Sequence, residues 1–162
     1  EIFLKYTQRN FPITASCYDG HAVYIRLAGA NLNSVHRQVA EHIVETTTFW
    51  QQLRDQQLAF FQTQQPLWRL SVPAITPPLD LAGETFIEWG GALRWLRSDL
   101  SAQVIREKVA AVGGHATLYR GGKVNDEIFH PLPKNLAVLH QRLKAQFDPH
   151  NILNRNKMYP SQ

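Results

Sequence analysis

The sequence contains a single cysteine, Cys17, among its 162 residues, and this scarcity excludes several kinds of site. One cysteine cannot form an internal disulfide, a four-cysteine zinc site or an iron–sulfur cluster. The histidines show no metal-ligand spacing either, since His36 and His42 would not share a face of a helix. We therefore expect Cys17 to be a small buried hydrophobe in a strand and the chain to hold no metal.

Long apolar runs are also absent, and no stretch approaches the length of a membrane span. The chain has no initiator methionine and no signal peptide, so we expect it to be a piece of a longer protein. It contains no glycine-rich phosphate-binding phrase such as G-x-G-x-x-G. The net charge is +4, but the basic residues are scattered, and 44% hydrophobic residues are ordinary for one soluble domain spanning 1–162.

Two hairpins are predicted from alternating sequence on either side of glycine turns. Residues 13–18 and 22–27 flank Asp19-Gly20, a pair that favours a type I′ turn. Residues 85–89 and 92–97 flank Gly90-Gly91 in the same way. Further strands are predicted at 67–72 and 115–120, where polar and apolar side chains alternate.

Four helices are predicted from apolar residues at helical spacing. They cover residues 32–43, residues 48 to about 61, a segment capped by Asp99 or Ser101, and a last helix whose stripe is Leu136, Leu139, Leu143 and Phe147. The resulting order, β-β-α-α-β-β-β-α-β-α, rules out a doubly wound parallel sheet. We predict a ferredoxin-like α+β fold, a mostly antiparallel sheet with helices packed on one face.

The C-terminal segment reads F-D-P-H-N-I-L-N-R-N-K at 147–157. This phrase resembles the end of FAD-linked oxidases of the vanillyl-alcohol oxidase and D-lactate dehydrogenase type, and it departs from them at Arg155 and Asn156. We expect the tail to be docked, with Ile152, Leu153 and Met158 buried.

Four further phrases carry a narrower resemblance that covers nearly the whole chain. They are F-W-Q-Q-L-R at 49–54, L-W-R-L-S-V-P at 67–73, E-W-G-G-A-L-R-W at 88–95 and G-G-H-A-T-L-Y-R at 113–120. Together they resemble the FAD-binding E subunits of bacterial glycolate oxidase, and the chain looks like the C-terminal cap domain of such a subunit.

The resemblance implies a flavin-dependent 2-hydroxyacid dehydrogenase complex that oxidises glycolate to glyoxylate. It implies that FAD is held mainly by an N-terminal domain absent from this chain, so that this piece alone is inactive. It also implies a D subunit that carries flavin, an F subunit that carries iron–sulfur clusters, and a cytoplasmic location at the inner face of the cell membrane. The H-x-G-D-G-N-x-H phrase of the D subunits is missing here, so the resemblance assigns no catalytic base.

Candidate residues for the side facing flavin and substrate lie in the second hairpin and the strand at 115–120. They are Trp89, Arg94, Trp95, Arg97, His115 and Tyr119. An arginine fork suits a carboxylate or phosphate, and tryptophan can stack on a flavin ring. The alternatives are interface arginines, core tryptophans and surface histidines. Asn154 and Lys157 are candidates for contact with the cofactor.

Two other functions stay open at the level of sequence. One is a noncatalytic ferredoxin-like module that binds a partner protein and supports assembly of the complex. The other is a basic RNA-binding sheet, although the chain has no RNP1-like aromatic phrase and only one Arg-Gly-Gly, at 120–122. Binding that weakens steeply with added salt would favour RNA.

Overall fold

The computed structural model describes residues 11–29, 32–39, 48–122, 127–155 and 157–159. In chain order the elements are β1 (Ile13–Tyr18), β2 (Val23–Leu27), α2 (Leu32–Val39), α3 (Thr48–Arg54), β3 (Leu67–Ser71), β4 (Glu84–Glu88), β5 (Leu93–Arg97), α4 (Ala102–Ala111), β6 (His115–Arg120) and α5 (Lys134–Phe147). Short 3-10 helices cover Ala59–Phe61 and Trp89–Gly91. The predicted order of strands and helices is confirmed. The predicted end of the helix at 32–43 lies outside the described residues.

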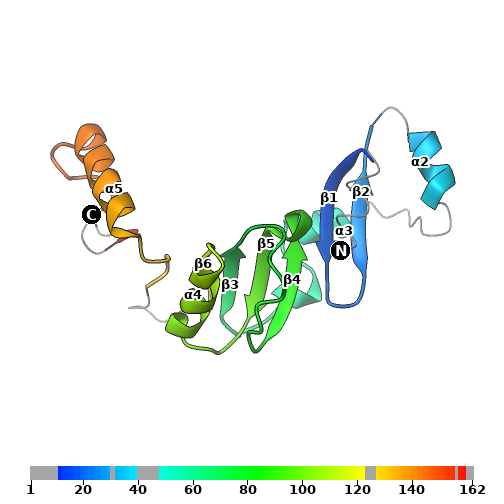
Figure 1. Ribbon diagram of the computed structural model, residues 1–162, viewed down its shortest axis with the longest axis horizontal. Helices are drawn as coiled ribbons and strands as arrows, with labels where there is room; N and C mark the ends of the chain where they lie inside the picture. The colour runs from blue at the N-terminus through cyan, green and yellow to red at the C-terminus, as the bar shows by residue number, and fades with distance from the viewer. Residues whose placement is uncertain (1–10, 30–31, 40–47, 123–126, 156, 160–162) are drawn as a thin grey trace.

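The strands form one six-stranded sheet in the order β2-β1-β4-β5-β3-β6. Every neighbouring pair is antiparallel. From β3 to β6 the chain follows a β-α-β-β-α-β path in which the loop 72–83 stands where the first helix would be. The α+β class and the ferredoxin-like prediction are therefore confirmed, and Figure 1 shows the strands side by side at the centre of the molecule.

The first hairpin closes differently from its prediction. Tyr18 pairs with Val23, so the loop has four residues, and only Gly20 has a positive φ, of 99°. The Asp19 carboxylate accepts the backbone N–H groups of His21 and Ala22, each at 2.8 Å. A two-residue type I′ turn is therefore wrong here, because the Asp19 side chain closes a wider loop.

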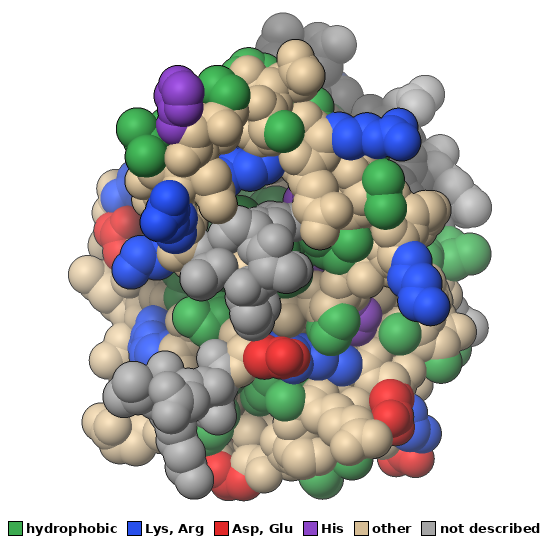
Figure 2. Space-filling view, turned by 90° about the vertical axis from the view of Figure 1, so that its left-hand side faces the viewer, with side chains coloured by type: hydrophobic (Ala, Val, Ile, Leu, Met, Phe, Trp, Pro, Cys, Tyr) green, Lys and Arg blue, Asp and Glu red, His purple; other side chains and the backbone are tan. Residues whose placement is uncertain are grey.

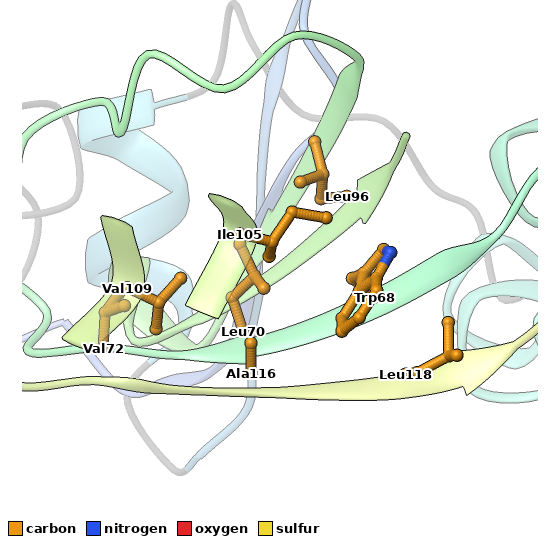
Figure 3. Close-up of a cluster of buried hydrophobic side chains, with 8 residues drawn as sticks. All are labelled: Trp68, Leu70, Val72, Leu96, Ile105, Val109, Ala116 and Leu118. Carbon is orange, nitrogen blue, oxygen red and sulfur yellow. The ribbon is translucent and has the colours of Figure 1, made fainter. Parts of the chain in front are cut away.

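One face of the sheet packs against α4. The Ser101 hydroxyl accepts the N–H of Val104 at 3.4 Å and so caps the helix. Ile105 and Val109, four residues apart, then point into the sheet. Figure 3 shows the cluster that results, whose members are Trp68, Leu70, Val72, Leu96, Ile105, Val109, Ala116 and Leu118.

The opposite face is covered as well, which differs from the prediction of helices on one face. α3 ends at Arg54, Gln56 takes a positive φ of 53°, and a 3-10 turn then carries Phe61. The expected single helix from 48 to 61 is thus two short pieces. Their side chains pack on the strands in a second cluster, made of Cys17, Leu53, Phe61, Leu67, Phe86, Leu93 and Trp95.

The last helix does not bury its apolar stripe within the described chain. Leu139 is 50% exposed and Phe147 is 84% exposed, and Figure 1 shows α5 at one end, away from the sheet. The tail beyond it is also open, with Ile152 70% and Met158 53% exposed. The predicted burial of Ile152, Leu153 and Met158 is wrong. The described tail is held by polar contacts to α5 and by the ring of Tyr159, whose centre lies 6.0 Å from that of Phe129.

Those contacts converge on Asp148, which is buried. Its carboxylate accepts Lys144 Nζ at 2.6 Å and the N–H groups of Ile152 and Leu153 at 3.0 and 2.9 Å. These bonds lower the pKa of Asp148 to about 2, the Lys144 bond most of all. The Asp148 carboxylate thus ends α5 and fixes the first turn of the tail through its hydrogen bonds.

Candidate functional site

The candidate site lies on the face that carries Trp95, beyond the part covered by Phe61. Register places Arg69 of β3 opposite Trp95 of β5 and opposite Thr117 of β6. Tyr119 follows two residues later on the same face of β6. We call Arg69, Glu88, Trp89, Trp95 and Tyr119 the arginine–aromatic cluster.

Trp95 connects this cluster to the core. Its side chain is 6% exposed and meets the Phe61 ring edge-on at 5.6 Å between centroids. Its other neighbour is the ring of Tyr119, at 4.9 Å and 78°. Tyr119 is itself 51% exposed, so a buried ring supports a ring that faces outward. The prediction that one of the two tryptophans is a core residue is confirmed for Trp95.

Trp89 is the exposed tryptophan, with 65% of its surface open. It has a positive φ of 53°, a conformation that is uncommon outside glycine and that clusters at functional sites. The next residue, Gly90, donates its N–H to Ser16 Oγ at 3.0 Å. The guanidinium carbon of Arg69 lies 5.5 Å from the centre of the Trp89 ring. The turn therefore presents a flat aromatic surface beside a cation.

Glu88 is the half-buried acid of the cluster. Its Oε1 accepts the indole N–H of Trp95 at 2.6 Å. Burial raises the pKa of Glu88, while the Trp95 hydrogen bond and the charge of Arg69 act in the opposite direction. A carboxylate with a raised pKa beside an open aromatic surface is typical of groups that exchange protons.

Arg94 lies on the opposite face from this cluster, as the odd spacing from Arg97 predicts. It is 5% exposed and donates to the carbonyls of Gly91 at 3.2 Å and Pro77 at 2.8 Å, and also to that of Thr76. Burial lowers the pKa of its guanidinium. These contacts hold the loop 72–83 against the sheet, so Arg94 is not part of the arginine–aromatic cluster.

Arg97 shares the face of Trp95 but lies under the covering segment. It forms an ion pair with Glu84 and donates to the carbonyl of Phe60 at 3.2 Å. Its guanidinium also lies 5.1 Å from the centre of the Phe60 ring. Its two terminal nitrogens are thus engaged inside the fold, its Nε is buried, and Arg97 does not reach the open part of the face.

His115 is exposed at the start of β6, on the same face as Tyr119. His130 packs nearby and its Nδ1 accepts the N–H of Ala116 at 3.3 Å. Burial lowers the pKa of His130, and the charges of Arg106 and His115 add to this effect. Asn154 and Lys157 are not gathered with the cluster, because both are exposed on the tail beyond α5, where the Lys157 N–H bonds the Asn154 carbonyl at 3.2 Å.

Two members of the cluster were missed from the sequence. Arg69 sits in the middle of a predicted strand, where alternation alone marked it as a polar position. Glu88 lay within the strand predicted at 85–89 and was not singled out. Only the register of β3, β4 and β5 brings Arg69 and Glu88 to the same surface.

The exposed rings suit contact with part of a flavin, whereas the described residues provide no site that suits a whole FAD. Trp89 and Tyr119 offer flat or edge contacts to a planar ring. The segment before α4 is Ser98-Asp99-Leu100-Ser101, which contains no glycine to let a pyrophosphate approach the helix end. Within the described residues, no group of three or more His, Cys, Asp or Glu side chains is arranged to hold a metal. No described helix is long and apolar enough to cross a membrane.

Comparison with known proteins gives one strong match. The chain is 42% identical over 149 residues to the glycolate oxidase subunit GlcE of Escherichia coli (strain K12). The match covers 91% of this chain but only 42% of that subunit, so the chain spans less than half the length of this relative. No protein-family model matches the chain. No solved structure matches it.

Proposed function

We propose that this chain, which belongs to the FAD-linked oxidase family as a GlcE-like C-terminal domain, is the substrate-side cap of a flavin-dependent 2-hydroxyacid dehydrogenase. The reaction proposed for the whole complex is the oxidation of glycolate to glyoxylate. The similarity to a glycolate oxidase subunit supports the reaction. The observation that carries the position of the site is the pair of exposed rings on this face, Tyr119 against the buried Trp95 and Trp89 against Arg69.

In this proposal the arginine–aromatic cluster faces the flavin and the substrate. The flavin, when bound, supplies the acceptor for two electrons. The residues of this chain bind and orient what lies against them: Trp89 and Tyr119 provide the apolar wall, and Arg69 provides a positive charge. Since the described residues offer no cradle for the pyrophosphate, the rest of the full-length subunit would hold most of the FAD.

The partners proposed are a flavin-carrying D subunit and an iron–sulfur F subunit, in a cytoplasmic complex at the inner face of the membrane. The relative is a subunit by name, which supports assembly with other chains. The exposed apolar stripe of α5 supports it too, because stripes of this kind mark contact surfaces.

The test uses the full-length subunit with its partner subunits. Trp89→Ala and Tyr119→Ala should each slow glycolate-dependent flavin reduction and change the visible absorption of the bound flavin. Ile75→Ala is the matched control, because Ile75 is 81% exposed in the loop 72–83 and lies outside the cluster. If both variants assemble and keep the wild-type rate and spectrum, the cluster is not the flavin side and the proposal is wrong.

A second candidate function is a noncatalytic module that only supports assembly. The open stripe of α5 favours it. Leu139→Ser and Leu143→Ser would then abolish co-purification with the partner subunits, while the cluster variants would leave glycolate oxidation unchanged. An RNA-binding role has less support, because basic side chains are scattered among hydrophobic ones on the face shown in Figure 2.

A further inference from the structure

Arg69 differs from the other arginines of the sheet because no donor of its side chain makes a hydrogen bond within the described residues. Arg94, Arg97 and Arg120 all donate to carbonyl or side-chain oxygens of the protein. Arg69 makes no hydrogen bond and no ion pair through its side chain within the described residues, although it is half-buried. A guanidinium with five N–H donors and no acceptor on the protein is available to a ligand.

The position of this guanidinium is nevertheless restricted. The Trp89 ring lies 5.5 Å from its carbon, and Arg69 is held on a central strand between β5 and β6. Stacking on a ring leaves the N–H edges of the guanidinium uncovered. Such an edge matches the two oxygens of a carboxylate.

The Glu88 side chain, on the same surface as the Arg69 guanidinium, is also held in a fixed orientation. The Trp95 indole holds Oε1 at 2.6 Å, and no donor within the described residues binds Oε2. Arg69 acts on Glu88 through its charge, yet the two do not form an ion pair. One oxygen of Glu88 and the donors of Arg69 therefore remain open on the same surface.

We infer that Arg69 binds the carboxylate of a small 2-hydroxy acid and that Oε2 of Glu88 accepts the proton of its hydroxyl group. This inference rests on the proposed function and assigns one residue to each polar group of the substrate, the carboxylate and the hydroxyl. The two groups suit a molecule with a carboxylate and a hydroxyl on adjacent carbons, such as glycolate.

The chemistry balances with a flavin as the oxidant. The hydroxyl O–H bond breaks and its proton goes to Glu88. The hydrogen on the same carbon is lost together with the C–H bonding pair, and a bound flavin would supply the acceptor for these two electrons. The carbon–oxygen bond becomes a carbonyl, and Glu88 then returns its proton to solvent.

The titratable groups that face Glu88 determine how the rate of the reaction depends on pH. Arg69 faces it from β3 and lowers its pKa, whereas Cys17 faces it from β1. The pKa of Cys17 is raised to about 12, chiefly by burial, so Cys17 stays neutral at ordinary pH. Glu88 must be deprotonated to accept a proton, so the rate should rise with pH through a pKa above the usual value for glutamate.

Arg69 is tested in the assembled full-length complex. Arg69→Gln should raise the KM for glycolate and the Kd for oxalate, a carboxylate probe measured by calorimetry, by about 10- to 100-fold. Arg69→Lys should recover part of the loss. Arg142→Gln is the matched control, since Arg142 is exposed on α5. An unchanged oxalate Kd in Arg69→Gln would overturn the assignment.

Glu88 is tested through the shape of the pH profile. Glu88→Gln should lower kcat more than it raises KM and should remove the rise of rate with pH. Arg69→Gln should move that rise to higher pH, because a charge that lowers the pKa is lost. Glu107→Gln, on the exposed side of α4, should change neither. If the Glu88→Gln enzyme keeps the wild-type kcat and the rise of rate with pH, the role assigned to Glu88 is wrong.

Failure of this inference can be told apart from failure of the proposed function. If Trp89→Ala and Tyr119→Ala alter flavin reduction but the Arg69 and Glu88 variants do not, the surface is right and the two polar assignments are wrong. If none of the four variants has an effect in an assembled complex, the proposed function itself is wrong.

Discussion

At the scale of single residues, Arg94 and Arg69 show how one residue type takes two roles on one sheet. Both lie on central strands, and Arg94 points to the face that packs on α4, where backbone carbonyls of the loop 72–83 accept its donors. Arg69 points to the other face, where no protein acceptor of the described chain lies against it. The direction of the side chain decides between a structural and a binding arginine.

Arg94→Ala should therefore cost stability and not substrate affinity. Removing the guanidinium takes the donors away from the carbonyl of the buried Gly91 and from that of Pro77, which we expect to lower the free energy of unfolding by about 1–3 kcal/mol. Urea denaturation measures the loss, and the KM for glycolate of the full-length complex should stay unchanged. A stable variant with a raised KM would place Arg94 at the substrate instead.

Asp148 gives a prediction for acid pH. Its folded pKa, about 2, lies below the ordinary value, so its contribution to stability is complete above that ordinary value and is lost as the pH falls through about 2. Carboxyl chemical shifts should follow this titration, and the amide groups of Ile152 and Leu153 should lose protection together with it. Asp148→Asn should remove the effect, while Asp80→Asn, at an exposed position, should not. A normal pKa for Asp148 would contradict this.

At the scale of elements, α4 and α5 have similar sequence patterns and different surroundings. Each has apolar residues at helical spacing, yet Ile105 of α4 is fully buried and Leu139 of α5 is half exposed. A periodic pattern predicts that a helix forms, and it says nothing about what lies against the apolar side. This is why the helix at 134–147 was predicted correctly and its packing was not.

The two helices should respond differently to the same kind of change. Ile105→Ala should lower the free energy of unfolding by about 2–5 kcal/mol, because it leaves a cavity in a packed cluster. Leu139→Ala should change it by no more than about 0.5 kcal/mol in this chain, since its surface is already open. Thermal and urea unfolding would measure both. A large loss for Leu139→Ala would mean that α5 is packed after all.

At the scale of the whole molecule, the strands, their order along the chain and the fold class could be predicted from alternation and from glycine turns. The candidate site could be predicted only in part. Trp89, Trp95 and Tyr119 were recognisable as aromatic residues in predicted strands or at a turn, but Arg69 and Glu88 join them through register, which depends on pairings far apart in sequence. The coverage of the second face by Phe61 was likewise hidden, because a short 3-10 turn leaves no periodic pattern.

The whole chain should bind FAD weakly when it is tested alone. Its described residues offer rings for contact but no glycine-containing helix start for a pyrophosphate before α4. Titration of the 162-residue chain with FAD, followed by flavin fluorescence, should show no saturation in the micromolar range. Tight saturable binding would contradict this and would place the main FAD site within this chain.

The pairing between β1 and β4 has a dynamic consequence. In the described chain, two ladder pairs, Cys17 with Glu88 and Tyr18 with Ile87, join β1 to β4, and Gly90 adds one bond to Ser16. In contrast, β4, β5, β3 and β6 are joined over five residue pairs at each step. Amide hydrogens of β1 and β2 should therefore exchange with solvent through a partial opening that leaves the other four strands intact. Glu88 lies at that junction, so each opening would also expose the remainder of its half-buried side chain. Detachment of the hairpin would then lower the pKa of Glu88, because the burial that raises this pKa is lost.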